Sequence, residues 1–349
     1  MFPLVNGAPP LVADTVLLRD RDGAETIVVC VKGTFDIDES GSPILSSEQQ
    51  PLTVLPTHRG APGQSSLIAE PDIGLPTPST DVTCAAVAYA PHGTAVRCLD
   101  VSISVGRISK TLRVAGDRYW RSGARGHSIS EAIPFERVPI LYERAYGGRA
   151  TKIDGSLDWD ERNPIGTGWC CEPPRDGQLL PNIEYPDKLV RSWKDRPPPA
   201  GFGPIERHWM PRRTLAGTYD EEYLKHRSPL PPVDLDDRFY LSSSADQQAG
   251  RRLVGGEEVT LVNLTTAGFM RFAVPKLRLG LSCHIAGSVG YHAMHLDALR
   301  IQTDSLRLEM LWRASIPCHR KSHKVRRINV WAKEWLFEHD RRVRQAATV

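Results

Sequence analysis

Ser288 stands in a glycine-rich segment that resembles the site of a serine nucleophile. The segment reads Ala286-Gly287-Ser288-Val289-Gly290, and His284, His292 and His295 lie close to it in the sequence. In hydrolases such a serine works because a strained turn between a parallel strand and a helix exposes its hydroxyl, while a histidine acts as the base. The chain lacks the alternation of strands and helices that builds such a sheet. We therefore interpret the segment as a glycine-rich β-turn.

Histidines and cysteines near the C-terminus could supply ligands for zinc. His292 and His295 are followed by Cys318, His319 and His323. Zinc sites usually show regular pairs such as CxxC, or a helix with the pattern HExxH, and neither occurs here. The irregular spacing favours structural or surface histidines, so we expect no metal and no cofactor. A hydrolase that uses Ser288 with a nearby histidine, or a zinc-dependent one that uses His292 and His295, is the alternative function.

Acidic residues form two other patterns with possible chemistry. The run 36–41 begins like a calcium-binding loop, but Ser47 occupies the twelfth position, where such loops need a glutamate. We therefore predict a solvated hairpin turn there. Asp158, Asp160 and Glu161 could form an acid–base pair, although solvated acids in loops are far commoner. The sequence contains no phosphate-binding glycine loop and no dinucleotide fingerprint.

The composition is that of a globular protein with a sizeable core. The chain has 349 residues, of which 40% are hydrophobic and 24% charged, and its formal net charge is +3. Glycine and proline contribute 28 residues each, which favours many short strands joined by turns over a helical bundle. The N-terminus lacks the pattern of a signal peptide, and no apolar run approaches the ~18–20 residues of a membrane helix. We predict a cytoplasmic protein with free thiols.

Hydrophobic and β-branched stretches predict strands in the first and last thirds of the chain. We expect a mainly-β protein with a sandwich or barrel-like antiparallel core. A short helix is expected at 220–226. The predicted strands are 15–18, 26–35, 82–89, 95–105, 110–114, 259–264, 269–274 and 306–313.

The middle of the chain, residues 145–213, shows no periodicity but is rich in tryptophan. Glycine and proline break any helix in this stretch, while a disordered segment would contain few aromatic residues. We interpret it as a long-loop insertion laid over the β-core. Tryptophan and arginine dominate many protein interfaces, so partner contacts are predicted here, although pinning of the loops to the core explains the tryptophans equally well. The predicted contact residues are Trp159, Trp169, Trp193, Trp209, Arg144 and Arg149.

The C-terminal segment 318–349 is basic, and we treat it separately from a β-rich domain over 1–317. A helix is predicted over 329–344, with Asn329 as its cap and Trp331 and Trp335 on one face. This face either packs on the core of the protein or docks a partner. Nucleic-acid binding through the basic residues is a weaker possibility, because the rest of the chain is mildly acidic.

Several short motifs, in a fixed order, resemble a bacterial family known as the domain of unknown function 2169. The resemblance runs from about Asn6 to about Pro317. The motifs are Val29-Cys30-Val31-Lys32-Gly33-Thr34-Phe35-Asp36, Tyr142-Glu143-Arg144-Ala145-Tyr146-Gly147-Gly148, Asn163-Pro164-Ile165-Gly166-Thr167-Gly168, Leu180-Pro181-Asn182-Ile183-Glu184, Asp246-Gln247, Leu253-Val254-Gly255-Gly256-Glu257-Glu258 and the stretch 306–317.

The resemblance implies a role without catalysis. Members of this family are similar in context to adaptors of the type VI secretion system. Such an adaptor holds a toxic effector, often one with a PAAR-like spike-tip domain, and loads it onto the secretion spike. No catalytic residues are established for the family, so none is carried over. We therefore predict a non-enzymatic cytoplasmic adaptor or chaperone whose partner is a secreted effector or a spike protein, with no membrane contact.

Overall fold

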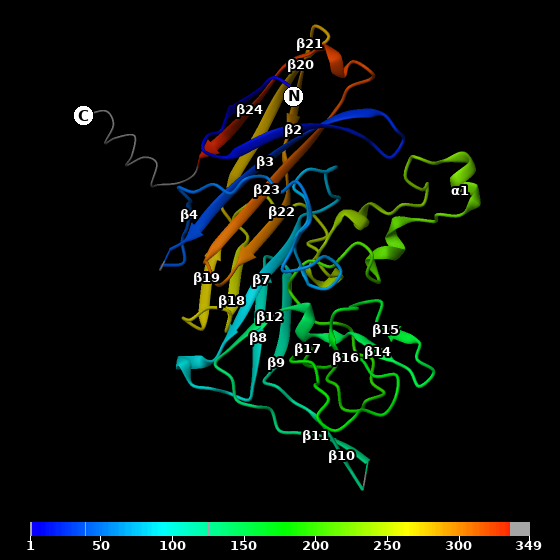
Figure 1. Ribbon diagram of the computed structural model, residues 1–349. Coiled ribbons are helices and arrows are strands. Elements are labelled where there is room, and N and C mark those ends of the chain that lie inside the picture. The colour runs from blue at the N-terminus through cyan, green and yellow to red at the C-terminus, as the bar shows by residue number, and fades with distance from the viewer. Residues whose placement is uncertain (1, 39, 125, 336–349) are drawn as a thin grey trace.

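The computed structural model describes residues 2–38, 40–124 and 126–335, and most of its regular structure is β-sheet (Figure 1). A seven-stranded sheet has the strand order β12-β7-β22-β23-β3-β2, with β4 attached to β3. Its strands are β2 (Val12–Arg19), β3 (Glu25–Ile37), β4 (Pro43–Leu45), β7 (Asp81–Tyr89), β12 (Arg137–Ile140), β22 (His295–Gln302) and β23 (Arg307–Pro317).

Two further sheets share the core with the large one. The five-stranded sheet, in the order β17-β9-β8-β18-β19, contains β8 (Cys98–Val105), β9 (Ile108–Ala115), β17 (Ile183–Glu184), β18 (Glu258–Val262) and β19 (Phe269–Ala273). The four-stranded sheet, in the order β1-β24-β20-β21, contains β1 (Leu4–Gly7), β20 (Leu277–Ile285), β21 (Ser288–Ala293) and β24 (Val325–Trp335). Smaller pairs are β5 (Thr57–His58) with β6 (Leu67–Ala69), β10 (Trp120–Gly123) with β11 (Gly126–Ile129), β13 (Tyr146–Gly147) with β16 (Thr167–Gly168), and β14 (Arg149–Thr151) with β15 (Leu157–Trp159).

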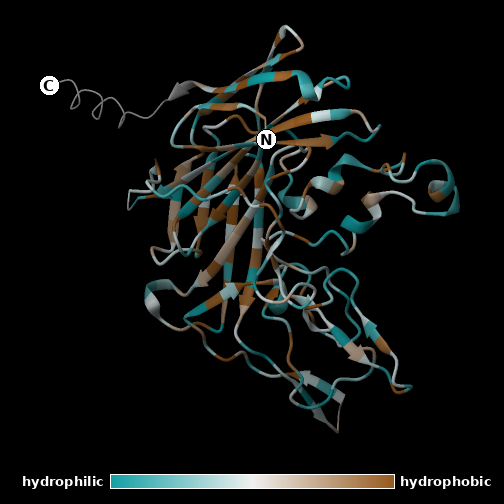
Figure 2. Cartoon of the chain, turned by 45° about the horizontal axis from the view of Figure 1, so that its top comes forward, coloured by the Kyte–Doolittle hydropathy of each residue, from teal (hydrophilic) through white to brown (hydrophobic). Residues whose placement is uncertain are grey.

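One continuous hydrophobic core joins the three larger sheets. Val31 from β3, Ile103 from β8 and Leu281 from β20 are all completely buried in it. Figure 2 shows the same arrangement, with hydrophobic residues along the strands and hydrophilic ones in many of the loops. Burying these apolar side chains provides the main driving force for folding.

Strand β3, next to the edge strand β2 of the large sheet, is buried on both faces along most of its length. One face contributes Val29, Val31 and Phe35 to the core. On the other face, Lys32 lies under the loop that follows β4, where its ammonium contacts Asp72 at 3.2 Å and Glu309 at 2.9 Å. A buried charge needs such partners to offset its desolvation.

The mainly-β prediction is confirmed. The strands predicted at 15–18 and 26–35 lie within β2 and β3, which pair antiparallel from Val12 opposite Lys32 to Arg19 opposite Glu25. Within residues 2–335 no sheet closes into a barrel, so the core is built from open sheets packed together. The predicted short helix is α1 (Glu221–His226), and the side chain of Asp220 caps it by accepting from the Tyr223 amide at 2.8 Å.

The helix predicted over 329–344 is wrong as far as residue 335. Residues Val325–Trp335 form strand β24, between β20 and β1. Ile328 and Val330 alternate with polar neighbours and are fully buried, so the period is that of a strand. The remaining predicted helical residues, 336–344, lie outside the described residues.

The tryptophan-rich segment forms ordered loops beside the β-core, as predicted, and appears in green in Figure 1. All seven cysteines are free thiols. Among the described residues, no helix has the length and apolar character needed to span a membrane.

Candidate partner-binding site

Asn163 holds the loop segments together at one buried point. Its side chain is completely buried, and its amide Nδ2 donates to the carbonyls of Tyr142 at 2.8 Å and Tyr146 at 3.0 Å. Gly147, at φ 144°, packs so closely that a Cβ there would lie 2.3 Å from the Asn163 carbonyl oxygen. Gly166 is equally constrained, because a Cβ there would lie 2.4 Å from Asn163 Nδ2. These residues therefore fix the backbone of the loops.

Asn182 and Glu184 attach these loops to the five-stranded sheet. The Asn182 side chain donates to the Ala115 carbonyl, which ends β9, at 3.1 Å. Glu184 is buried, pairs with Arg118 at 2.6 Å and accepts from the Val190 amide at 2.6 Å. We call the segments 142–148, 163–168 and 180–184, which these contacts join, the loop framework. Gly168 is tightly packed within it, since a Cβ there would lie 2.8 Å from Pro181. The loop region is thus a rigid extension of the sheet.

Glu143 and Arg144 complete this framework from the short helical turn 142–144. The carboxylate of Glu143 accepts hydrogen bonds from the amide and the hydroxyl of Ser66. Arg144 Nη1 donates to Asn182 Oδ1 at 3.2 Å, so this predicted contact residue stabilises the framework. Pro164, directly after the buried Asn163, is half-buried.

Three of the four predicted tryptophans pin the loops. Trp209 is 1% exposed and meets the ring of Tyr142 edge-on at 5.6 Å. Trp169 is half-buried, with the Arg196 guanidinium 4.7 Å from its ring centroid. Trp169 and Trp193, which is also half-buried, pack against a small cluster of buried residues: Trp120, Tyr146, Leu180 and Val190. Trp209 therefore does not reach the surface.

Trp159 is the exposed member of the set. It lies on the β14–β15 hairpin, with Leu157 two residues before it and therefore on the same face of the strand. Trp159 is 47% exposed, Leu157 61%, and Ile153 in the connecting turn 90%. Arg149 is exposed and lies directly opposite Trp159 in the register. This hairpin surface, Arg149, Ile153, Leu157 and Trp159, is an apolar patch beside a cation.

The base of the hairpin is fixed to the loop framework. The Asp160 amide donates to the Gly148 carbonyl at 3.1 Å. The buried Asp160 carboxylate accepts from two nitrogens of Arg162, at 2.8 and 2.7 Å. The Asn163 amide in turn donates to the Asp160 carbonyl at 3.0 Å. A partner would therefore meet a preorganised surface, which lowers the entropy cost of binding.

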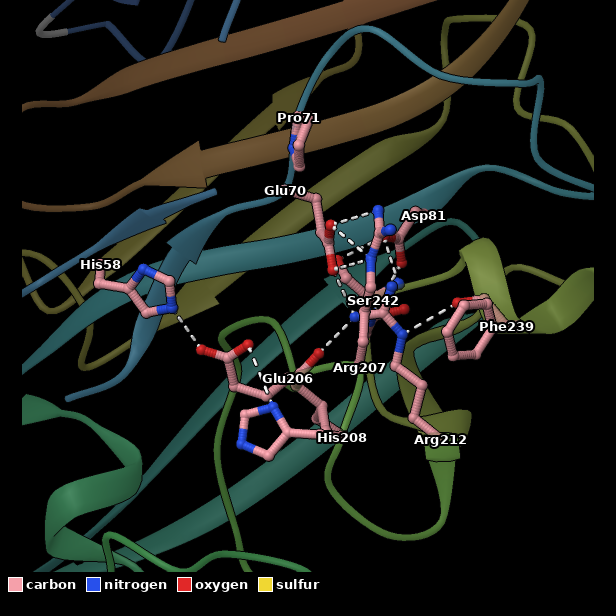
Figure 3. A network of polar contacts seen from close by, with 12 residues as sticks. His58, Glu70, Pro71, Asp81, Glu206, Arg207, His208, Arg212, Phe239 and Ser242 are labelled. Atoms are coloured by element: carbon pink, nitrogen blue, oxygen red, sulfur yellow. Dashed lines mark hydrogen bonds and ion pairs between the residues drawn. The ribbon is translucent and has the colours of Figure 1, made fainter. Parts of the chain in front are cut away.

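Glu70, directly after β6, bonds to two arginines of the loop region. In Figure 3 it lies between two arginines, with Nη2 of Arg207 at 2.8 Å and Nη1 of Arg212 at 2.6 Å. Arg212 also donates through Nε to the Phe239 carbonyl at 2.9 Å. Burial acts to raise the pKa of Glu70, but the two guanidinium groups outweigh it and lower the pKa below its usual value. The same figure shows His58 bonded to Glu206 at 2.5 Å.

Comparison with known families confirms the resemblance carried by these motifs. A model of a family described as an uncharacterized protein conserved in bacteria (DUF2169) matches residues 22–313. The chain belongs to this family. No curated protein and no solved structure matches the chain. The DUF2169 match includes the loop framework and the hairpin surface.

The serine segment of this DUF2169 protein is a hairpin turn. Ala286 and Gly287 both have positive φ, 49° and 86°, and connect β20 to β21 so that Ser288 pairs with Ile285. Two such residues between antiparallel strands are typical of a tight hairpin. Among the described residues, no hydrogen bond joins Ser288 to a histidine. The interpretation as a glycine-rich turn is therefore confirmed.

The zinc-dependent alternative function would use His292 and His295. His292 and His295 line a groove of about 600 Å³ between the four-stranded sheet and the large sheet, together with Trp331. Burial lowers the pKa of both histidines. In the part of the chain that the structure covers, no group of three or more His, Cys, Asp or Glu side chains is arranged to bind a metal.

The aromatic residues of β24 belong to the fold. Trp331 packs edge-on against Tyr291 at 6.2 Å and covers Gly280, where a Cβ would lie 3.0 Å from its ring. The backbone of Trp335 pairs with Leu277, and its side chain lies outside the described part of the structure. Trp331 is thus engaged in contacts within the chain.

Lys110 is a buried lysine that no sequence pattern marks as a site residue. Lys110 on β9 donates to Ser244 at 2.7 Å, Asp246 at 2.9 Å and Gln247 at 2.8 Å. Burial lowers its pKa to about 8 despite the nearby Asp246 carboxylate. Asp246 and Gln247 form one of the family motifs, so this side of the contact could be recognised in the sequence. Lys110 lies more than 130 residues earlier and belongs to no motif.

Proposed function

We propose that this protein is a non-enzymatic cytoplasmic adaptor that binds a secreted effector of a type VI secretion system and loads it onto the secretion spike. Membership of the DUF2169 family supports the adaptor role, because members of this family are similar in context to adaptors of the type VI secretion system. The structural support comes from the hairpin surface. The partner contacts are therefore assigned to Arg149, Ile153, Leu157 and Trp159.

The observation that carries the proposal is an exposed apolar patch on a rigid mount. Exposed apolar side chains are normal one at a time, but Ile153, Leu157 and Trp159 lie together on one short hairpin. Tryptophan and arginine are the residues that most often dominate binding energy at interfaces. Arg149 and Trp159 provide both at one position of the register. Such a surface fits a partner with an apolar patch bordered by an acidic side chain.

The partner class comes from the family resemblance. We assign the effector, with its PAAR-like spike-tip domain where it has one, as the polypeptide that the hairpin surface contacts. Binding before secretion would keep an aggregation-prone effector soluble, which is the chaperone part of the role.

Co-expression with a candidate effector of a type VI secretion system from the same bacterium tests the proposal. The wild-type protein is expected to co-purify with the effector and to increase its soluble yield. Trp159→Ala should weaken the complex, whereas Phe269→Ala, which removes a 58% exposed aromatic ring from β19, serves as the matched control. An effector that is soluble, active and fully secreted in a strain lacking this protein would contradict the proposal.

A further inference from the structure

The four-stranded sheet has an outer face that the core does not cover. Leu281 of β20 and Val330 of β24, which lie opposite each other, belong to its buried side. Their neighbours along each strand extend in the opposite direction, because successive side chains of a strand alternate between the two faces. By the register of the four strands, the outer face includes Val5, Val289, Tyr291, Arg327, Asn329 and Trp331.

Tyr291 exposes its ring on this outer face. The residue is 76% exposed, although Trp331 meets its ring edge-on at 6.2 Å. Val5 and Val289 on the same face are 42% and 45% exposed. Most of the Tyr291 ring is therefore free for a ligand, while Trp331 holds it in place.

The chain that leads into β24 concentrates positive charge beside this face. Residues 318–333 contain six lysines and arginines and no acid. The carboxylate of Glu25 contacts the segment, accepting from the hydroxyl of Ser322 at 2.7 Å, and one carboxylate does not balance the cations. Five of the cations are exposed and have no ion-pair partner in the part of the chain that the structure describes: Arg320, Lys321, Lys324, Arg326 and Arg327.

The cations and the ring belong to one surface. Arg327 of β24 and Tyr291 of β21 are two strands apart, and two residues apart along the register that runs through β20. With ordinary sheet spacings their Cα atoms lie about 12 Å apart. The basic segment also meets the β20–β21 turn, where the Ala286 amide donates to the Lys324 carbonyl at 3.3 Å. An arginine on a phosphate and a tyrosine on the attached base can together span such a separation.

A single strand of nucleic acid uses both features. Its phosphates pair with exposed lysines and arginines, while its unpaired bases stack on aromatic rings. A double helix keeps its bases stacked on one another, and an acidic peptide or a lipid headgroup has no flat ring to place on Tyr291. Basic runs are common on protein surfaces, and the exposed ring beside this one distinguishes it.

We propose that the outer face of the four-stranded sheet, together with the basic segment 319–327, binds single-stranded nucleic acid. A base stacks on Tyr291, and the phosphates pair with Arg327 and with the cations of the segment. The face lies at the end of the molecule away from the β14–β15 hairpin (Figure 1), so this site is independent of the adaptor role.

Fluorescence anisotropy with the full-length protein and a labelled oligothymidylate of twelve nucleotides tests the site. The oligonucleotide should bind at low salt, and its affinity should fall steeply as salt is added. Tyr291→Ala should weaken binding by about tenfold through the loss of one stacked base, whereas Tyr291→Phe, which keeps the ring, should bind like the wild type. Tyr219→Ala is the matched control, because Tyr219 is 60% exposed and lies beside α1.

The charges are tested by a second set of variants. Lys324→Gln combined with Arg327→Gln should weaken binding by about tenfold at low salt. It should also make the slope of log affinity against log salt shallower by about 1.4, the value for two lost phosphate contacts. Arg59→Gln combined with Arg107→Gln is the control, because both arginines are exposed and lie in turns outside this sheet.

Three other ligands separate single-stranded nucleic acid from other anions. A twelve-residue oligoglutamate, vesicles containing phosphatidylserine and a duplex of twelve base pairs should each bind at least about fivefold more weakly than the oligothymidylate. No binding of the oligothymidylate, equal or tighter binding of any of these three ligands, or unchanged affinity in Tyr291→Ala would each overturn the proposal.

Discussion

Arg149 and Trp159 lie directly opposite each other across the β14–β15 hairpin, at its end nearest the loop framework. Opposed residues of an antiparallel pair extend from the same face of the hairpin, so one partner can contact both side chains. Leu157, two residues before Trp159, adds to the same face. The hairpin surface thus combines a cation with apolar area.

Arg149→Glu should weaken effector binding, and the loss should be largest at low salt concentration, where charges are least screened. In our account Arg149 meets an acidic group of the partner, and the substitution replaces attraction with repulsion. The association rate at low and high ionic strength, measured by surface plasmon resonance, tests this. Arg121→Glu, which reverses an exposed charge on the separate strand β10, is the control and should leave the association rate unchanged. An equal loss with both variants would show only a general charge effect.

Asn163→Asp should lower the free energy of unfolding by about 2–5 kcal/mol. The carboxylate cannot donate, so the carbonyls of Tyr142 and Tyr146 lose their buried donor. Urea denaturation measures the change. Asn263→Asp is the matched control, because the Asn263 amide donates to the Asp100 carbonyl in an exposed setting, where the loss should stay below about 1 kcal/mol. Equal losses at the two positions would contradict the structural role of Asn163.

Acid should destabilise the fold through Glu70 and Asp72. Burial acts to raise the pKa of Asp72, but Arg300 and Lys32 outweigh it, and the pKa lies below 3.8. The pKa of Glu70 likewise lies below 4.5. Because both values are lower in the folded state, the stabilisation is complete above the unfolded values and is lost as the pH falls through the folded ones.

Urea unfolding between pH 6 and pH 3 tests this linkage. The wild-type free energy of unfolding should fall steadily below about pH 4.5, the unfolded value for Glu70. Glu70→Gln should give a smaller slope from a lower starting stability. Asp297, whose pKa is raised by burial, acts in the opposite direction and reduces the fall without reversing it. A stability that stays constant over this range would contradict the roles of both carboxylates.

Ser288→Ala combined with His295→Ala should leave effector delivery unchanged. Ser288 follows a hairpin turn, and His295 lines the groove between the four-stranded sheet and the large sheet. Secretion of the effector by a strain carrying the double variant is the measurement. Loss of delivery with normal protein levels would support the hydrolase alternative.

The sequence predicted the elements whose side chains alternate clearly, and missed those with weaker patterns. Residues 277–285 are the exception, because no strand is predicted there although Leu277, Leu279 and Leu281 alternate with other residues. In β24, helix-favouring residues after Asn329 hid a strand that β20 and β1 stabilise through pairing. Tertiary pairing overrides local propensity in such cases.

The candidate site was predictable by region but not by residue. The four tryptophans have the same side chain in similar loops, and only the fold separates the buried Trp209 from the exposed Trp159. Ion pairs such as that of Lys110 with Asp246 join residues distant in the sequence, so no local pattern reveals them.

The affinity of the Leu157→Asp variant for the cognate effector, measured by calorimetry beside the wild-type protein and Phe269→Asp, tests the adaptor account most directly. Leu157 is 61% exposed, so the substitution should leave the unfolding transition unchanged. Our account predicts a loss of at least about 30-fold for Leu157→Asp, the ~2 kcal/mol of an interface hot spot, and almost none for Phe269→Asp. Wild-type affinity in Leu157→Asp would contradict it.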